Sequence, residues 1–161
     1  MFNLFTKKQQ LDIYACVSGQ IKPLMSVNDP VFSKGYIGPG VAIEPSDSII
    51  YAPVRGMIKM IFPTLHALGI VTESGHEILI HVGIDSVKLK GEGFHSWVEV
   101  GKHVEVGDPL LSVDFNSFKQ HHINEDVLMV ITSPVEHHEV VFHQLANPVT
   151  KKHCVFTLRL T

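Results

Sequence analysis

The sequence YACVSGQIK (residues 14–22) recurs, with six of its nine positions unchanged, as YAPVRGMIK (residues 51–59). A single repeat is too little for a solenoid, which needs at least three stacked units. It does suit two similar hairpins that are related by approximate symmetry within one β domain. The repeat therefore predicts an internally duplicated β motif.

Short runs rich in Val, Ile and Phe continue outward from the repeat, and Gly, Pro, Asn and Asp separate them about every ten residues. Only Asn116–Asn124 shows helical periodicity, with Asp114 as its cap. We therefore expect an all-β fold, an antiparallel β-sandwich or flattened barrel with only short helical segments. The candidate strands are Gly40–Ile43, Ile49–Tyr51, Gly56–Ile61, Gly69–Glu73, Glu77–Val82, Pro109–Asp114, Val127–Ile131 and Cys154–Leu160.

The composition is that of one globular domain, with 161 residues of which 45% are hydrophobic and 18% charged. We assign residues 14–161 to that domain and residues 1–13 to a flexible N-terminal segment. A formal charge of -3 provides no electrostatic footprint for nucleic acid. Cys16 and Cys154 lie far apart without CxxC spacing, so we expect reduced structural thiols.

The N-terminal residues do not resemble a signal peptide, because Lys7 and Lys8 follow the apolar residues and no long apolar run is present. We therefore expect a cytoplasmic protein. Phe2, Leu4 and Phe5 beside these lysines allow at most weak contact with a membrane surface.

The stretch LIHVGID (residues 79–85) places a histidine in an apolar strand, and His66 precedes it by fifteen residues. Burying an imidazole is costly and asks for a chemical reason. A backbone carbonyl beyond His81, such as that of Gly83, can accept the proton of one ring nitrogen and leave the other free as a nucleophile. His66 would stabilise a phosphoryl group on that nitrogen, and Thr64 can orient His66 through its hydroxyl. On spacing alone, a structural histidine is the commoner interpretation.

A longer set of motifs favours a functional role for His81 over a structural one. The most specific is IHVGIDSVKLKGEGF (residues 80–94), and matching segments lie on both sides of it. These segments are Asp29–Phe32, Gly38–Ile43, Ala52–Gly56, Thr64–His66 and Val104–Asp108. Over roughly residues 14 to 160 the sequence resembles the glucose-type enzyme IIA domains (EIIA type-1) of the bacterial phosphoenolpyruvate:sugar phosphotransferase system.

This resemblance implies a phosphotransferase component of sugar uptake. It would accept a phosphoryl group from the phosphohistidine carrier HPr and pass it to a cysteine of an enzyme IIB domain. By motif position, His81 is the phosphorylated nucleophile, His66 stabilises the phosphoryl group and Thr64 orients His66. No cofactor is required for this role, although a partner that supplied a carboxylate could complete a zinc site with His66 and His81.

The resemblance also implies a partner-binding surface around the two histidines. Its expected residues are the apolar Val31, Phe32, Phe62, Leu79 and Val87, together with Gly83, Asp29 and Asp85. A dry apolar rim would exclude water from a hydrolysable phosphoryl group. The two acids would repel a phosphoryl dianion, so we assign them to docking or orientation and not to a general base.

Three other interpretations stay open. Met57-Ile58-Lys59-Met60 imitates the modified-lysine turn of biotin and lipoyl carriers. A zinc peptidase could use His and Asp ligands, but the side chains of the doublets at 121–122 and 137–138 would point apart on a strand. A regulatory binding module of the same fold would sense the phosphorylation state without efficient onward transfer. The sequence shows no transporter domain and no IIB-like cysteine motif, so we expect the chain to act in trans.

Overall fold

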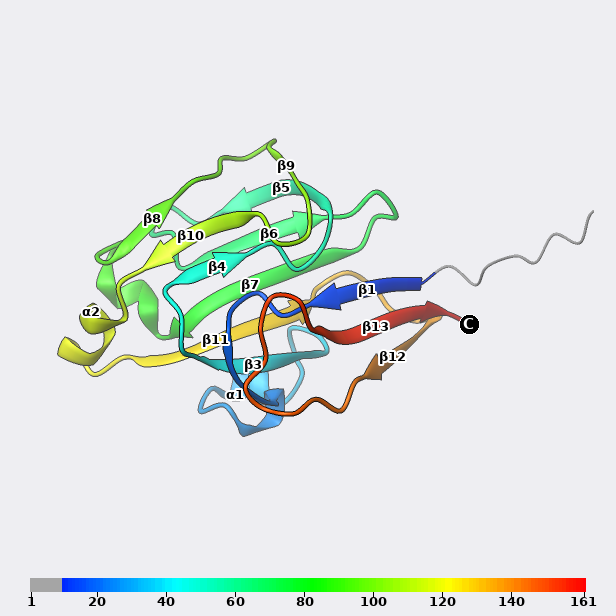
Figure 1. Ribbon diagram of the computed structural model, residues 1–161, viewed down its shortest axis with the longest axis horizontal. Helices are drawn as coiled ribbons and strands as arrows, with labels where there is room; N and C mark the ends of the chain where they lie inside the picture. Colours follow the sequence, from blue (N-terminus) through cyan, green and yellow to red (C-terminus); the bar gives the residue numbers. More distant parts are fainter. Residues whose placement is uncertain (1–9) are drawn as a thin grey trace, which may run out of the picture.

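The computed structural model describes residues 10–161, and short antiparallel strands dominate it (Figure 1). In chain order the elements are β1 (Gln10–Tyr14), β2 (Gly19–Pro23), the 3-10 turn η1 (Leu24–Ser26), α1 (Pro30–Ser33), β3 (Gly40–Pro45), β4 (Ile49–Tyr51), β5 (Gly56–Ile61), β6 (Ala67–Val71), β7 (Glu77–Ile84), the 3-10 turn η2 (Ser86–Leu89), β8 (Phe94–Ser96), β9 (His103–Val104), β10 (Pro109–Val113), α2 (Phe115–Gln120), β11 (Asn124–Ile131), β12 (His138–Phe142) and β13 (Cys154–Leu160). Among residues 10–161, no helix has the length and apolar character needed to cross a membrane.

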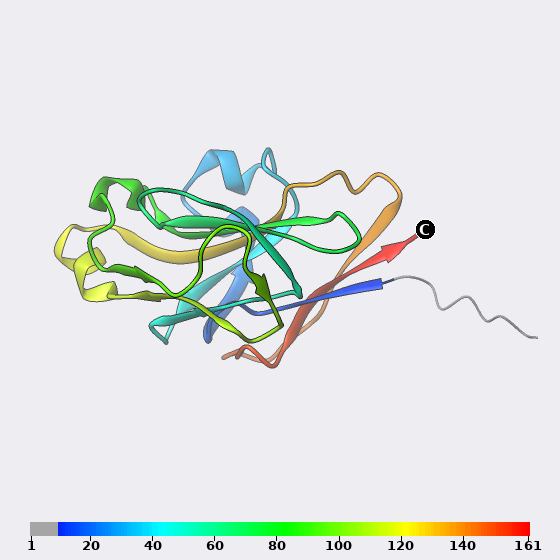
Figure 2. The ribbon, with the colours of Figure 1, turned by 90° about the horizontal axis from the view of Figure 1, so that it is seen from above.

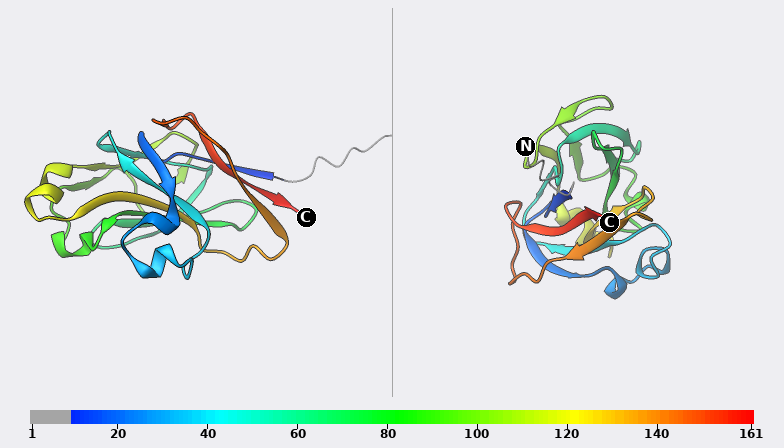
Figure 3. Two further views of the ribbon diagram at one scale, coloured as in Figure 1. Left: turned by 90° about the horizontal axis from the view of Figure 1, so that it is seen from below. Right: turned by 90° about the vertical axis from the view of Figure 1, so that its right-hand side faces the viewer.

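The strands form three sheets around a shared apolar core. The largest sheet has the order β2-β3-β11-β7-β6-β5-β9, and two three-stranded sheets have the orders β1-β13-β12 and β4-β10-β8. The end-on view in Figure 3 shows the sheets around a common interior, with α1 outside them. Fully buried side chains such as Ile13, Ile58, Leu111, Met129 and Phe156 belong to this core. The predicted all-β fold is confirmed.

The central strands of the largest sheet bury both of their faces. On β7, Ile78, Ile80 and Val82 point into the main core, whereas Leu79 and His81 alternate with them on the outer face. A second, smaller apolar cluster covers part of that outer face. It consists of Leu24, Val27, Phe32, Ala42, Ile84, Leu128 and Val130, with Ile37 and Leu79 packed against it. The alternation thus places His81 beside α1 and outside the main core.

The two copies of the repeat bond to each other reciprocally. The amide of Tyr14 donates to the carbonyl of Pro53 at 3.0 Å, and the amide of Tyr51 donates to the carbonyl of Cys16 at 2.7 Å. Each copy then enters an antiparallel hairpin, β2–β3 or β5–β6. These hairpins flank the central β11–β7 pair on opposite sides, so an approximate twofold axis relates the two halves of the sheet. The predicted duplication of a β motif is therefore present.

The N-terminal boundary differs from the expectation. Residues 10–13, which the sequence assigns to a flexible segment, form most of β1, and β1 pairs with β13 (Figures 1 and 2). Ile13 is fully buried in the main core, and this burial holds the strand in place. The apolar and basic residues at positions 2–8 lie outside the described part of the chain.

The predicted strands are present in the structure, some of them with bounds that differ by a few residues. β4, β5 and β13 have the predicted bounds, whereas β6 begins at Ala67 instead of Gly69. The predicted helix cap is also present, because Asp114 Oδ1 accepts a hydrogen bond from the Asn116 amide at 3.0 Å, although α2 ends at Gln120. β2, β8, β9, β12 and α1 are not among the predicted strands and helix, because they are short or only partly buried and therefore show little hydrophobic periodicity.

Candidate active site

His66 and His81 lie side by side on the outer face of the largest sheet. His81 is on β7 and is directly opposite Ala67, the residue after His66, in the β6–β7 ladder. The amide of Val82 donates to the His66 carbonyl at 2.7 Å, which extends this ladder by one bond. The two ring centroids are 5.1 Å apart, and the ring planes cross at 82°. The fold thus brings together two histidines that are fifteen residues apart in the sequence.

One nitrogen of His81 is committed to the backbone. Its Nδ1 lies 2.8 Å from the carbonyl oxygen of Gly83. A carbonyl can only accept, so Nδ1 carries the proton and Nε2 keeps a free lone pair. Gly83 has a φ of 84° and approaches its neighbours closely, because a Cβ there would be 2.5 Å from Cε1 of Phe118. The glycine therefore sets the carbonyl that fixes the His81 tautomer.

His66 is oriented by the hydroxyl of Thr64. Thr64 Oγ1 lies 2.6 Å from His66 Nδ1, and His66 is 5% exposed. Leu65, between them, has a φ of 59°, a conformation that is uncommon for a residue with a side chain. Such strain is characteristic of functional sites, where the surrounding structure holds the backbone in place. Here it allows the Thr64 and His66 side chains to meet two residues apart.

Both imidazoles are held neutral at physiological pH. Burial and, to a smaller extent, the neighbouring His66 lower the pKa of His81 to about 4. The hydrogen bond to Gly83 and the carboxylates of Asp29 and Asp85 act in the opposite direction on this pKa. Burial also lowers the pKa of His66. A neutral His81 has its Nε2 lone pair available for attack on an electrophile.

Two aromatic rings support the histidine pair. Phe32 packs on His81 with ring centroids 5.0 Å apart, and Phe62 contacts His66 edge-on at 5.2 Å. Phe32 comes from α1, whose N-terminus is capped by Asp29 through a 2.9 Å hydrogen bond from the Val31 amide to Oδ1. Asp29 thus positions the helix that presents Phe32 and contributes charge near His81.

The remaining residues expected at the partner-binding surface differ in how far they are exposed. Val31, Phe62 and Val87 are exposed, at 47%, 36% and 51% of their surface. Phe32 is only 7% exposed, and Leu79 is half-buried against the same cluster as Phe32. Asp85 is exposed and adopts a left-handed backbone conformation just before η2. Val31, Phe62 and Val87 are thus accessible to a partner, whereas Phe32 mainly packs against its neighbours.

The sequence pattern does not predict several further residues near the site. Met60 is 40% exposed and pairs with Gly69 in the β5–β6 ladder, whose next strand carries Leu79 opposite Gly69. Met25 and Tyr36 are more than two thirds exposed, and they are next in sequence to Leu24 and Ile37 of the small cluster. Ser86 is fully buried and donates a hydrogen bond to the Val82 carbonyl. Met60, Met25 and Tyr36 lie outside the quoted family motifs, whereas Ser86 lies within the motif at residues 80–94, four residues after its partner Val82.

The structure gives little support to a biotin or lipoyl carrier or to a zinc peptidase. Lys59 lies within β5 and pairs with Glu77, so it is not at the tip of an exposed hairpin as a biotin or lipoyl lysine requires. Within residues 10–161, no group of three His, Cys, Asp or Glu side chains is arranged to hold a metal ion. Zinc peptidase chemistry needs three protein ligands and an open position. The described residues therefore do not provide such a centre.

Comparison with known proteins agrees with this geometry. Residues 11–136 match the family described as phosphoenolpyruvate-dependent sugar phosphotransferase system, EIIA 1. The chain is 44% identical over 126 residues to a raffinose carrier protein of Pediococcus pentosaceus. The aligned residues make up 78% of this chain but only 20% of that protein's length. The glucose permease IIA of Mycoplasma capricolum matches with a TM-score of 0.86 and 34% identity, over 96% of this chain and 99% of that structure. The chain therefore belongs to the EIIA type-1 family of the phosphoenolpyruvate-dependent sugar phosphotransferase system.

Proposed function

We propose that this chain is a phosphocarrier in which Nε2 of His81 accepts a phosphoryl group from phospho-HPr and passes it to a cysteine of an enzyme IIB domain. The observation that carries this proposal is the 2.8 Å contact between His81 Nδ1 and the Gly83 carbonyl. It leaves Nε2 as the free ring nitrogen of a neutral imidazole. A fixed tautomer is what a histidine nucleophile requires.

Each transfer breaks one bond to phosphorus and forms another. In the first, the Nε2 lone pair of His81 attacks phosphorus while the bond between phosphorus and the HPr histidine breaks. In the second, a cysteine thiolate attacks phosphorus and the bond to His81 Nε2 breaks. No atom is oxidised or reduced in either step. Such transfers depend on positioning and charge stabilisation rather than on covalent work by the protein.

His66 is placed to stabilise the transferring group. When the Thr64 hydroxyl donates to His66 Nδ1, the proton of that imidazole resides on Nε2 and can be donated to a phosphoryl oxygen. The ring centroid distance of 5.1 Å brings His66 within reach of a group bound to His81. Donors preorganised toward developing negative charge lower the barrier to transfer.

The rim around the pair fits transient docking. Val31, Phe62 and Val87 form an apolar border that a partner can cover, and their coverage excludes water from the phosphoryl group. Asp29 and Asp85 lie close enough to affect the His81 charge and would repel a dianion. A cationic side chain from a docked partner would offset this repulsion. The same docking could supply the carboxylate that a zinc ion would need beside His66 and His81.

Transfer kinetics with His66→Gln test the proposal. Glutamine keeps a donor but cannot become cationic, so acceptance from phospho-HPr should continue while transfer to the IIB cysteine slows by roughly 100-fold. Radiolabelled phosphoenolpyruvate, enzyme I, HPr and an isolated IIB domain would give both rates by rapid quench. The matched control is His95→Gln, at an exposed position on β8.

The outcomes distinguish transport from regulation. Unchanged onward rates in His66→Gln would remove the stabilising role of that imidazole. If the unaltered protein accepted the phosphoryl group but never passed it to any IIB cysteine, the regulatory binding module would replace the phosphocarrier in sugar uptake.

A further inference from the structure

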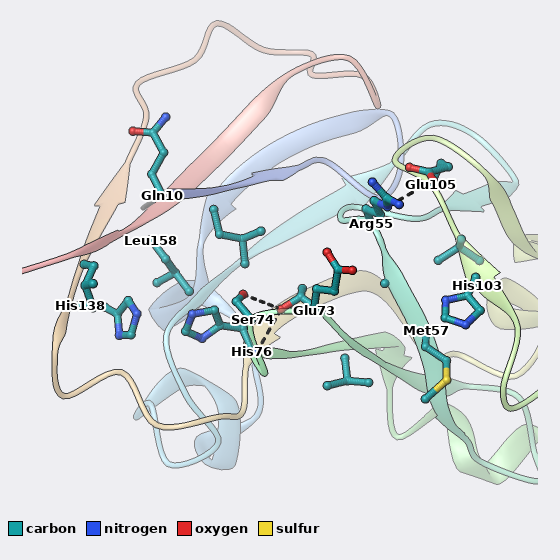
Figure 4. A pocket seen from close by; sticks show the side chains of 16 residues that line it. Gln10, Arg55, Met57, Glu73, Ser74, His76, His103, Glu105, His138 and Leu158 are labelled. Carbon is teal, nitrogen blue, oxygen red and sulfur yellow. Dashed lines mark hydrogen bonds and ion pairs between the residues drawn. The ribbon is translucent and has the colours of Figure 1, made fainter. Parts of the chain in front are cut away.

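A second histidine pair lies in a pocket at the other end of the β6–β7 hairpin (Figure 4). The pocket has a volume of about 630 Å³ and includes residues of the β6–β7 turn, β5, β9, β12 and β13. His76 comes from the turn before β7, and His138 is the first residue of β12. His76 precedes His81 by five residues, about 17 Å along the strand, so the two histidine pairs are separate.

The two imidazoles of this second pair are in contact. Their ring centroids are 4.6 Å apart, and the ring planes cross at 87°. Figure 4 shows the two rings next to each other at one end of the pocket, whereas Arg55 and Glu105 pair at its other end. β12 and β7 belong to different sheets, so this contact joins the β1-β13-β12 sheet to the largest sheet.

His138 also has an unsatisfied polar atom. Its Nδ1 is buried and has no hydrogen-bond partner among the described residues. Nearly all buried polar side-chain atoms have a partner, and an unsatisfied one costs free energy. Residues 10–161 therefore leave the hydrogen bonding of His138 incomplete, beside a second imidazole.

The state of His76 bears on the kind of ligand. Burial lowers the pKa of His76, and the neighbouring His138 lowers it further. Near neutral pH His76 therefore offers a lone pair instead of a positive charge. A neutral imidazole suits a borderline divalent metal such as Zn²⁺, whereas an anion would need imidazolium.

We propose that His76 and His138 together form a two-histidine binding site for Zn²⁺, separate from the phosphoryl-transfer site. Two imidazoles that share a tetrahedral zinc have ring centroids about 5 Å apart, close to the separation in this pair. No third His, Cys, Asp or Glu of residues 10–161 completes the site, so water fills the other positions. The ion clamps β12 to the β6–β7 turn, reversibly and less tightly than a site with four protein ligands.

Zinc titration of a His81→Ala variant by isothermal calorimetry tests the site. This substitution removes the only other ring-to-ring imidazole contact in the described part of the chain, so binding at the phosphoryl-transfer site does not interfere. We expect one Zn²⁺ per chain near neutral pH. Adding His76→Gln or His138→Gln should weaken binding by roughly tenfold or more, because even outer-sphere partners of metal ligands are worth that much. Adding His137→Gln, at the exposed neighbouring residue, should leave binding unchanged.

A second measurement needs no substitution. In the unaltered protein, imidazole ¹H–¹⁵N correlation spectra should show the His76 and His138 signals shifting as Zn²⁺ is added, while the His103 signals from the same pocket remain in place. The site would be overturned if the His81→Ala parent took up no zinc, or if His76→Gln and His138→Gln bound it as the parent does. Binding of inorganic phosphate to the pair instead of Zn²⁺ would also overturn it.

Discussion

At the scale of single residues, the chemistry of the pair depends on which nitrogen of each imidazole carries its proton. His81 is bonded to a carbonyl and has Nε2 free, whereas His66 is bonded to a hydroxyl and can offer Nε2–H. In the proposed mechanism the two histidines in contact therefore have opposite roles, one as nucleophile and one as donor. The difference comes from the groups that their Nδ1 atoms meet and not from the imidazoles themselves.

The pKa of His81 gives a prediction for NMR titration. Its imidazole should stay neutral down to a midpoint at about pH 4. The unfolded chain takes up this proton near the ordinary value of 6.5, so His81 stabilises the fold above pH 6.5 and loses this effect as pH falls toward 4. The shift corresponds to at most about 3 kcal/mol. The difference in unfolding free energy between the unaltered protein and His81→Gln should therefore rise from pH 4 to 6.5. A midpoint at or above 6.5 would contradict this.

Thr64→Val should loosen His66 without changing the size of the side chain. The variant loses the 2.6 Å hydrogen bond to Nδ1, worth about 1 kcal/mol, and onward phosphoryl transfer should slow by roughly fivefold to tenfold. The measurement is the single-turnover rate from this protein to the IIB cysteine. Thr132→Val, at an exposed position, serves as the control and should keep the original rate. Equal rates for both variants would mean that Thr64 does not orient His66.

At the scale of elements, the end of β7 shapes the site. Gly83 is buried with a positive φ, and Asp85 follows it with another, so the chain turns sharply after the strand. Phe118 of α2 packs against the α-carbon of Gly83, leaving no room for a side chain. α2 thus supports the backbone that holds the His81 tautomer, although it contributes no group to the pair itself.

Gly83→Ala should therefore be much more harmful than Gly75→Ala. Both glycines have a φ near 85°, but an added Cβ at Gly83 would meet Phe118 at 2.5 Å, whereas Gly75 has nothing within 4 Å. The left-handed backbone costs each variant about 1 kcal/mol, and overpacking adds about 1–3 kcal/mol at Gly83 only. Chemical denaturation would measure the difference in stability. Similar losses in the two variants would show that Phe118 moves aside freely.

The bounds of several strands and the main residues of the candidate site are predictable from the sequence. β5 and β13 are apolar enough, and bounded clearly enough, for their extents to be read directly. The roles of His81, His66 and Thr64 come from family motifs, and the structure adds the hydrogen bonds that make those roles chemically reasonable. Phe118 and Met60 are not predictable in this way, because their proximity to the site depends on tertiary packing.

At the scale of the whole molecule, the two halves of the duplicated motif differ at the position of His81. Ala67 begins β6 and pairs with His81, whereas Gly40 begins β3 and pairs with Val130. Val130 therefore occupies the place in one half that His81 occupies in the other. The second half buries this position in the small apolar cluster beneath α1. One copy of the motif thus provides chemistry, and the other provides packing for the helix beside it.

The duplication also supplies a matched pair of salt bridges. Lys22 pairs with Asp126 in one half, and Lys59, at the equivalent position of the repeat, pairs with Glu77 in the other. The Asp126 side chain is 5% exposed and that of Glu77 is 36% exposed. Asp126→Asn should cost roughly 2 kcal/mol of unfolding free energy, because it removes the charged acceptor of the Lys22 ammonium at a position that water scarcely reaches. Glu77→Gln should cost about 1 kcal/mol or less. Thermal and urea unfolding would measure both, and equal losses would contradict the role given to burial.

The central claim is that His81 carries the phosphoryl group, and intact mass spectrometry tests it most directly. The protein is incubated with phosphoenolpyruvate, magnesium, enzyme I and HPr, beside the variants His81→Ala and His95→Ala. We predict an acid-labile gain of about 80 Da, one phosphoryl group, in the unaltered protein and in His95→Ala but not in His81→Ala. A gain that persists in folded His81→Ala, or no gain in the unaltered protein when HPr phosphorylates a known acceptor, would contradict the account.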